Sequence, residues 1–403
     1  MSDRPATGQP AAETWDAVVI GAGPAGSLTA LLLARSGQRV LLLERQKFPR
    51  AKVCGCCLNQ RAQQLLQRAG LLTGLQNLHP GKTQQMSLHF NGRTLPIPMP
   101  GGLAVSRRSM DQWLADEATA AGVCFQQESA AEVLPDDCDS EQTTARPRPA
   151  WRHVRITDAS GTRVVAGQVV LVCDGLGHSS LAAVPGFASR PRTGARIGLG
   201  AVLHAAESSG WLQPGEILMA ASDSGYCGAV QTEDGSVNLA AAVDAAAIQT
   251  TGGPRACLQQ IFAAAGVRTP QAFESVQIRG TVPLTRRSAR ITGHRLLLLG
   301  DATGYVEPFT GEGMAWALTA ATLAAPVAHR GITSGWDTAL QQQYEQQLGK
   351  SVVREQTVCR TLSWILSRPR ILKWSFSAAT MLPMAAAALV RRVNRVPISL
   401  EGS

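Results

Sequence analysis

The segment from residue 16 to residue 45 constrains the fold of this chain more than any other. "DAVVI", residues 16–20, predicts a short buried strand, and "GAGPAG" follows it directly. Residues 27–36 predict a helix, and "RVLLLER", residues 39–45, predicts a second strand. Two strands joined through a helix by short loops form a βαβ unit, in which the crossover is right-handed and the strands are parallel.

The glycine spacing in this unit predicts a dinucleotide site. Gly21 permits the tight turn, Gly23 lets backbone N–H groups approach a pyrophosphate, and Gly26 lets the helix and strand pack closely. The first helical turn, which includes Pro24 and Ala25, presents the positive end of the helix dipole to that anion.

Two acidic residues at strand ends predict which dinucleotide binds. Glu44 ends the second strand, where it can accept hydrogen bonds from a ribose diol. "RLLLLGD" forms another buried strand that ends on Asp301, which can hold a polyol chain. A glycine-rich loop then leads into a helix near Thr310, whose free N–H groups suit the negative charge of a reduced flavin. A ribityl-binding acid followed by this helix predicts FAD rather than NAD.

The order of the motifs along the chain is similar to that of a known group of proteins. The motifs are "VVIGAGPAG…LLLER", "FPRAKVCGCCL", "VSRRSMDQWL", "VLVCDGLGHSS" and "LLLLGDATGYVEPFTGEGM". Together they resemble the FAD-dependent monooxygenase superfamily, which has the p-hydroxybenzoate-hydroxylase fold, and most of all its geranylgeranyl reductase branch. The resemblance covers about residues 16–330.

This resemblance implies a fold class and a set of cofactor-binding residues. The fold is α/β (α+β overall), with a Rossmann-type FAD-binding domain, an inserted β-sheet substrate domain and a helical C-terminal tail. The implied cofactor-binding residues are Gly21, Gly23, Pro24, Ala25, Gly26, Glu44, Arg45, Arg107, Asp174, Asp301, Pro308, Gly311 and Gly313. Among them, Arg107 is implied to contact the phosphate or ribityl region, and the last three to lie beside the isoalloxazine ring.

The domain limits predicted from composition and motif order are discontinuous. Residues 1–14 are polar and predict a disordered leader without a signal peptide. The FAD-binding domain is predicted to comprise 15–85, 101–190 and 281–330, the substrate domain 86–100 and 191–280, and the helical C-terminal region 331–403.

The predicted substrate pocket has four candidate residues: Cys54, Cys56, Tyr226 and Pro308. Closed metal sites need paired ligand spacing, and the cysteines 54, 56 and 57 have no partner pair elsewhere, so no metal is predicted. We expect these cysteines to line the pocket, and a redox-active thiol remains an alternative. "GYCGAVQ", residues 225–231, stands where reductases of the branch often have "YxWxFP", so the Trp and Phe-Pro are absent. The catalytic residues are not predicted.

Three functions follow from these features. The favoured one is a flavin monooxygenase that hydroxylates a lipophilic or phenolic small molecule, because the missing aromatic residues leave a wider cavity. The alternatives are a reductase of isoprenoid double bonds and a non-catalytic flavoprotein. The chain has one dinucleotide fingerprint, so the expected electron source is NAD(P)H that docks transiently or a separate reductase.

Charge and cysteine usage predict the location. The formal net charge is +9, and residues 350–403 contain nine Lys and Arg against two Glu. No nucleic-acid-reading motif accompanies this charge, so no nucleic-acid partner is expected. Nine cysteines at irregular spacing do not form a disulfide scaffold, and we expect a cytoplasmic protein. The tail leaves three alternatives open: helices that pack on the core, peripheral contact of the basic tail with the inner membrane surface, or a spanning helix in the uncharged but short stretch 374–390.

Overall fold

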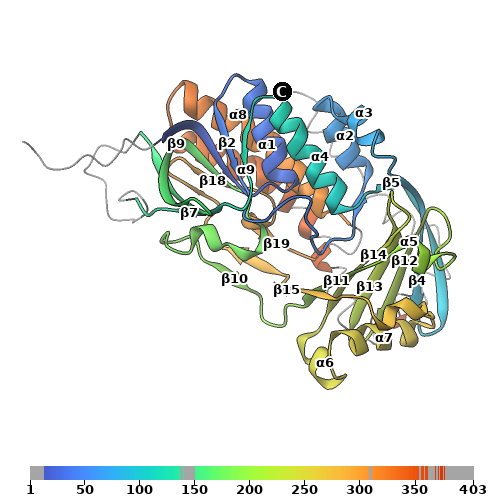
Figure 1. Cartoon of the computed structure of the whole chain (residues 1–403). Helices are drawn as coiled ribbons and strands as arrows, with labels where there is room; N and C mark the ends of the chain where they lie inside the picture. The colour runs from blue at the N-terminus through green and yellow to red at the C-terminus, as the bar shows by residue number, and fades with distance from the viewer. Residues whose placement is uncertain are drawn as a thin grey trace, which may run out of the picture.

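A computed structural model of the chain describes residues 13–136, 139, 150–307 and 311–353, and in the tail 355–357, 359–361, 368, 371, 373, 374 and 376. Two large sheets form two lobes in this part of the chain (Figure 1). The long helices lie over the lobe that contains the N-terminal strand, and shorter helices lie on the other lobe. The predicted α/β class, with a second, sheet-based domain, therefore matches the architecture.

The first lobe is built around parallel strands. β1 (Glu13–Ile20) lies between β2 (Val40–Leu43) and β9 (Gly161–Val172) and pairs in parallel with both. The sheet continues in parallel to β6 (Cys124–Gln126) beyond β2 and to β18 (Leu296–Leu298) beyond β9. Every residue of β2 and β18 is buried, because helices and loops cover both faces of such a sheet.

Short antiparallel strands complete this lobe. They are β17 (Thr292–Gly293), paired with β18, β8 (Arg152–Asp158), paired with β9, and β7 (Ala130–Val133), paired with β8. A separate three-stranded sheet lies between the two lobes in Figure 1 and comprises β10 (Ser189–Pro191), β16 (Arg286–Ser288) and β19 (Gly304–Tyr305). The 3₁₀ turns are η2 (Gly175–Gly177), η3 (Ser179–Leu181), η4 (Gln271–Glu274) and η5 (Gly300–Thr303).

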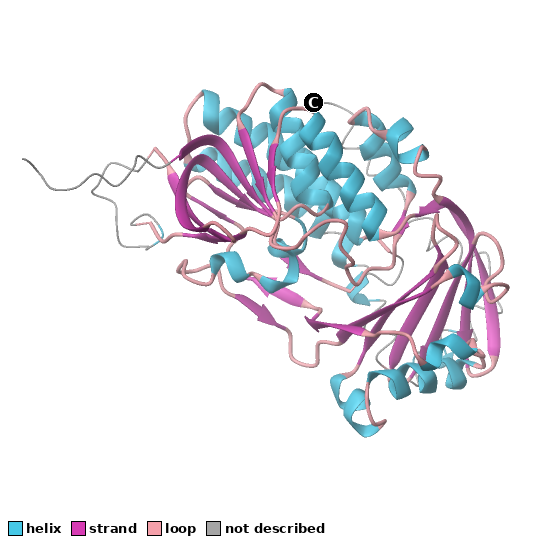
Figure 2. Ribbon diagram, viewed as in Figure 1, coloured by secondary structure: helices cyan, strands magenta, loops and turns pink. Residues whose placement is uncertain are grey.

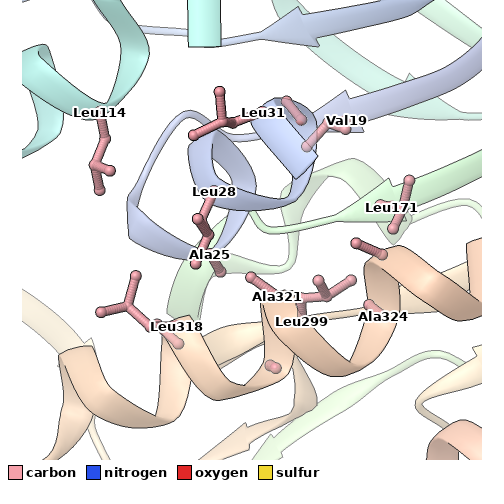
Figure 3. Close-up of a cluster of buried hydrophobic side chains, with 14 of the residues drawn as sticks. Val19, Ala25, Leu28, Leu31, Leu114, Leu171, Leu299, Leu318, Ala321 and Ala324 are labelled. Atoms are coloured by element: carbon pink, nitrogen blue, oxygen red, sulfur yellow. The ribbon is translucent and has the colours of Figure 1, made fainter. Parts of the chain in front are cut away.

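Helices cover one face of the first sheet (Figure 2). Helix α1 packs against α4 and α8, and α8 also packs against α2 and α9. In Figure 3, Leu28 and Leu31 of α1 lie in the same apolar cluster as Leu318 and Ala321 of α8. The bounds are α1 (Pro24–Arg35), α2 (Gln60–Arg68), α3 (Leu72–Gln76), α4 (Arg107–Ala120), α8 (Gly313–Thr333) and α9 (Thr338–Leu348).

The second lobe is an eight-stranded sheet with different contents on its two faces. Leu218 belongs to the apolar cluster that covers α7, and the next residue, Met219, belongs to a cluster that also contains Tyr226 and Cys56. Successive side chains of a strand point to opposite faces. One face of this sheet therefore packs against α7, and the opposite face carries the cluster that contains Met219, Tyr226 and Cys56. The helices of this lobe are α5 (Ala205–Ser208), α6 (Ala245–Thr250) and α7 (Pro254–Ala265).

The strand order in this sheet is β15-β11-β14-β13-β12-β4-β5-β3, and all neighbours are antiparallel except β12 and β4. The bounds are β3 (Cys57–Leu58), β4 (Gly81–Phe90), β5 (Arg93–Ala104), β11 (Ile197–Leu203), β12 (Glu216–Ser222), β13 (Gly225–Gln231), β14 (Val237–Val243) and β15 (Arg279–Pro283).

The lobe limits differ from the predicted domain limits. The prediction gave residues 86–100 to the substrate domain, but β4 begins at Gly81 and β5 ends at Ala104. The two strands stay paired across a register shift between Thr83 and Gln85, which keeps the glycine-containing end of β5 in the sheet. Strand β1 starts at Glu13, inside the predicted leader, and the rest of that leader lies outside the described residues.

The described part of the C-terminal region packs on the core. After α9 come a π-helical turn η6 (Gly349–Val353) and residues that contact three other elements. Glu355 forms an ion pair with Arg61 of α2 and accepts a 3.1 Å hydrogen bond from Trp316 Nε1 of α8. Phe376 is buried against Phe90 of β4, with ring centroids 5.7 Å apart. Among the described residues, no helix is both long and apolar enough to cross a membrane.

Candidate functional site

The turn after β1 has the geometry that the glycine spacing predicts. Gly21 has φ +100°, and a Cβ there would lie 2.4 Å from the carbonyl oxygen of Cys173. A Cβ on Gly26 would lie 1.8 Å from the carbonyl oxygen of Gly21, so the helix and strand are too close for a side chain. Gly23 is the N-cap of α1, and no side chain caps this end. The first N–H groups of α1 are therefore available to an anion.

Glu44 lies directly after β2 beside this turn. Its side chain is buried, and it accepts hydrogen bonds from the backbone N–H groups of Ala22 (3.2 Å) and Gln46 (3.0 Å). These bonds fix the carboxylate at the end of the strand, where a ribose is expected. The next residue, Arg45, is exposed and does not line the cavity described below.

A cationic cluster faces the N-terminus of α1. Arg107 donates two hydrogen bonds of 2.7 Å to the carboxylate of Asp111, and Arg50 Nη1 lies 3.1 Å from the same carboxylate. Arg50 Nε also lies 3.3 Å from Glu44. An added Cβ on Gly23 would lie 3.6 Å from Arg107 Nη2 and 3.8 Å from Arg50 Nη2. Two guanidinium groups therefore stand at the predicted pyrophosphate position.

Asp301 and Asp174 follow two neighbouring parallel strands but differ in placement. Asp301, after β18, lines the cavity, and its carboxylate is 3.8 Å from Lys52 Nζ. Burial is the main cause that lowers the pKa of Lys52. Asp174, after β9, accepts hydrogen bonds from the N–H (3.1 Å) and hydroxyl (2.7 Å) of Ser180, and Gly175 lines the cavity in its place.

The start of α8 forms another wall of the cavity. Gly311, Gly313 and Met314 line it, and no side chain caps this end of the helix. A Cβ on Gly311, which has φ +85°, would lie 3.2 Å from the Cβ of Cys57. Pro308, predicted to belong to this wall, lies outside the described residues.

Some of the predicted cofactor residues line one hollow of about 1300 Å³, a volume that counts the space open to solvent, whereas Gly21, Gly26 and Glu44 do not line it. Gly23, Pro24, Ala25, Arg107 and Asp301 line its cofactor side. The second sheet contributes an apolar wall: Met86, Ile217, Met219, Ala240, Ala241 and Ala242.

Three of the four pocket candidates line this hollow. Cys54, Cys56 and Tyr226 all do so, from the loop before β3 and from β13. Tyr226 is buried, and burial is the main cause that raises its pKa well above the usual value. The sequence analysis missed Lys52 and Arg50, although both lie in "FPRAKVCG", directly after the second strand.

A buried ionic group adjoins Tyr226 and was not predicted. Arg196 Nη1 donates to Glu307 Oε1 at 3.3 Å, and Arg196 Nε donates to Asp244 at 3.2 Å. The Arg196 guanidinium lies 5.7 Å from the ring centroid of Tyr226. Glu307 and Tyr305 line the same hollow, so one end of the apolar wall is polar. Among the described residues, no group of three or more His, Cys, Asp or Glu could hold a metal ion.

Comparison with known families decides the identity of the cofactor. Residues 14–346 match the family described as FAD binding domain, which is more than half of the chain. The chain belongs to this FAD-binding family. The menaquinone reductase of Mycolicibacterium smegmatis is 27% identical over 385 residues, which cover 89% of this chain and 86% of that relative.

Solved structures show the same fold. One is the p-nitrophenol 4-monooxygenase of Pseudomonas putida DLL-E4, with a TM-score of 0.72 and 17% identity over 95% of this chain and 97% of that chain. Another is a geranylgeranyl bacteriochlorophyll reductase-like protein of Thermoplasma acidophilum, with a TM-score of 0.70 and 19% identity over 88% of each chain. The predicted superfamily, its fold and FAD are confirmed, and the chain is an FAD-dependent oxidoreductase.

The residues of the site fit FAD. The α1 N-terminus has neither a capping side chain nor an acid in its first turn, and Arg50 and Arg107 stand beside it. An adenosine diphosphate moiety needs this combination of free N–H groups and positive charge. Asp301 and the uncapped N-terminus of α8 line the same hollow, and they would hold the ribityl and ring groups.

Proposed function

We propose that this protein is an FAD-dependent reductase that transfers hydride to a lipophilic substrate with a quinone or isoprenoid group. The observation that carries the proposal is the match to a menaquinone reductase over 89% of the chain. The apolar wall of the hollow supports it, because Met86, Ile217 and Met219 offer a surface for a long apolar chain. The sequence alone favoured hydroxylation, and that alternative becomes an outcome of the test below.

The polar end of the hollow orients the head of such a substrate. Glu307 is buried, and Arg196 donates a 3.3 Å hydrogen bond to it. Tyr226 keeps its proton because burial raises its pKa, so its hydroxyl is a donor at neutral pH. A quinone or phenol oxygen at this end would accept that hydrogen bond while the chain lies along the apolar wall.

When bound, FAD supplies the hydride and the electrons of the reaction. The residues of this chain do the rest. Arg50, Arg107 and the α1 N-terminus would hold the pyrophosphate, Asp301 would bind the ribityl region, and the N-terminus of α8 would stabilise negative charge on the ring. The second sheet covers the hollow with apolar side chains, which keeps water from the reacting groups.

The test is an anaerobic single turnover. The holoprotein is reduced with dithionite and mixed, without oxygen, with menaquinone in detergent, and the return of oxidised-flavin absorbance is recorded with the product mass. A product with two added hydrogens and reoxidised flavin supports the proposal. A flavin that stays reduced until oxygen is admitted, with a product that gains one oxygen atom, would establish hydroxylation. A flavin that dithionite does not reduce would indicate a non-catalytic flavoprotein.

The electron source and location belong to the same proposal. NAD(P)H or a separate reductase reduces the flavin, and stopped-flow mixing with NADPH and NADH distinguishes the two sources. A lipophilic substrate is reached most directly at a membrane surface. In the tail, Trp374 is 80% exposed and follows the exposed Lys373, a pair typical of peripheral contact with anionic lipid. We therefore propose a cytoplasmic protein that docks on the inner membrane surface.

A further inference from the structure

Three cysteines, two in the loop before β3 and one at its first position, have no assigned role in the reaction above. Of these, Cys54 and Cys56 line the hollow together with Asp301 and Gly311, next to the place where the flavin ring is expected. The Cys56 thiol donates a 3.7 Å hydrogen bond to the carbonyl oxygen of Cys54, and the two sulfur groups influence each other electrostatically. Two neighbouring thiols beside a flavin can be oxidised together, unlike a single buried cysteine.

The charges around the two sulfur atoms differ. The hydrogen bond from the Cys56 thiol is the largest cause that lowers the pKa of Cys54, to about 5, and the charge of Arg107 lowers it further. Arg107 also hydrogen-bonds Cys54, and Asp111 fixes its guanidinium. The pKa of Cys56 is raised, first by its hydrogen bond to Cys54. Near neutral pH, one sulfur is therefore a thiolate and the other a thiol.

The backbone fixes this arrangement from both sides. Asn238 Nδ2 donates a 2.7 Å hydrogen bond to the carbonyl of Cys54, and Val105 N–H donates a 3.0 Å bond to the carbonyl of Cys56. Cys56 has φ +57°, a conformation that side chains rarely adopt, and such strain gathers at functional sites. Gly55 between them has no neighbour within 4 Å of an added Cβ, which leaves room for a small movement.

We propose that Cys54 and Cys56 form a dithiol–disulfide redox pair that exchanges two electrons with the bound FAD. In the oxidising direction the Cys54 thiolate forms the S–S bond with Cys56 and the Cys56 S–H bond breaks. The two electrons and that proton pass to oxidised FAD, which becomes the reduced, singly protonated anion. An external dithiol, a small molecule or a protein, reopens the disulfide by exchange. The pair is thus a route by which thiol reductants charge the flavin. It rests on FAD binding and not on the proposed substrate.

Cys57, the first residue of β3, is the matched control beside the pair. Its thiol donates a 3.2 Å hydrogen bond to the carbonyl of Gly55. Burial is the main cause that raises its pKa to about 12, so it stays protonated and unreactive. Cys57→Ser therefore changes the loop as much as the other two serine variants do and leaves the pair intact.

The first experiment counts reducing equivalents. Holoprotein is oxidised with diamide, desalted and titrated with dithionite without oxygen. Wild type and Cys57→Ser should take up about twice as many equivalents per FAD as Cys54→Ser and Cys56→Ser, because the disulfide and the flavin each accept one electron pair. Equal uptake by all four proteins would overturn the proposal. If Cys54→Ser lost its FAD, Cys56→Ser would decide alone.

The second experiment identifies the bond and the electron transfer. The oxidised protein is denatured and treated with iodoacetamide, which should then label only Cys57 of the three cysteines, and tryptic cleavage releases residues 53–61 with all three. Dithiothreitol added anaerobically to oxidised holoprotein should bleach the flavin absorbance of wild type and of Cys57→Ser. The flavin of Cys56→Ser should bleach at least tenfold more slowly, and one tenfold step corresponds to ~1.4 kcal/mol in the activation barrier. Label on all three cysteines after diamide, or equal bleaching rates, would refute the pair.

Discussion

At Gly23, a substitution should affect cofactor binding without affecting folding. Its φ is −78°, which alanine adopts freely, and an added Cβ would meet only ordinary contacts with two arginines. We expect Gly23→Ala to fold with an unchanged melting temperature as apoprotein but to lose FAD, because the methyl group occupies the pyrophosphate position. Flavin absorbance per mole of purified protein measures the loss.

The control for this prediction is Gly26→Ala in the same turn. Its Cβ would overlap the Gly21 carbonyl at 1.8 Å, so this variant should be destabilised with or without cofactor. Full FAD content in the Gly23 variant would contradict the placement of the pyrophosphate.

Cys54 should titrate far below a free cysteine. Its pKa is lowered to about 5, so the reactive thiolate is present above that pH and is lost as the pH falls through it. The alkylation rate of residue 54 in apoprotein should therefore reach its plateau by about pH 6, against ~8.5 for the midpoint of an ordinary thiol. Cys56→Ala removes the largest cause of the lowered Cys54 pKa, so the midpoint of the alkylation profile should move to higher pH. A midpoint near 8.5 in wild type would contradict this electrostatic description.

Single residues could be predicted from the sequence where the backbone geometry allows only one residue type. Gly21 and Gly26 lie where any side chain would collide, and this requirement can be derived from the spacing alone. Lys52 and Arg50 could not be predicted in this way, because their roles depend on Asp301 and Asp111, which are distant in sequence. The sequence places the acid at a strand end but does not show which cation reaches it.

At the scale of elements, buried parallel strands were predictable and strand limits were not. β2 and β18 are continuous apolar runs because both faces are covered, and their ends carry Glu44 and Asp301 as expected. The predicted substrate-domain segment 86–100 is shorter than the strand pair β4 and β5, because these strands continue past a register shift and through glycines. A turn signal in the sequence does not show whether the partner strand stays paired there.

Phe376 joins the tail to the second sheet and gives a stability test at this scale. It is 3% exposed and packs against Phe90 in the cluster that includes Tyr226 and Met219. Phe376→Ala should lower the free energy of unfolding by about 3–5 kcal/mol, the usual cost of such a cavity. Urea unfolding measures it, with the exposed Trp374→Ala expected within about 0.5 kcal/mol of wild type. Equal stabilities of the two variants would mean that the tail does not pack on β4.

For the whole molecule, the hollow between the lobes follows from the chain order. The chain leaves the cofactor lobe through the loop with Lys52 and Cys54 after β2, and it later returns to this lobe in β18, which leads to Asp301 at the same sheet edge. The second sheet covers this edge with its apolar face. The resemblance predicted this arrangement, but the ionic group of Arg196 and Glu307 is formed across the lobes and has no local sequence signal.

The last prediction concerns the surface of the whole molecule. Trp374 is 80% exposed beside Lys373. Both belong to residues 350–403, a stretch of sequence with nine Lys and Arg and only two Glu. Wild type should sediment with phosphatidylglycerol-containing vesicles and not with pure phosphatidylcholine, and the bound fraction should fall as salt shortens the ~10 Å screening length. Trp374→Ser should reduce binding, because the indole enters the interface, whereas Val164→Ser on β9, another exposed apolar residue, should not. Binding that persists at high salt would show that charge does not drive the contact, and equal binding by both serine variants would remove the tail from the membrane contact.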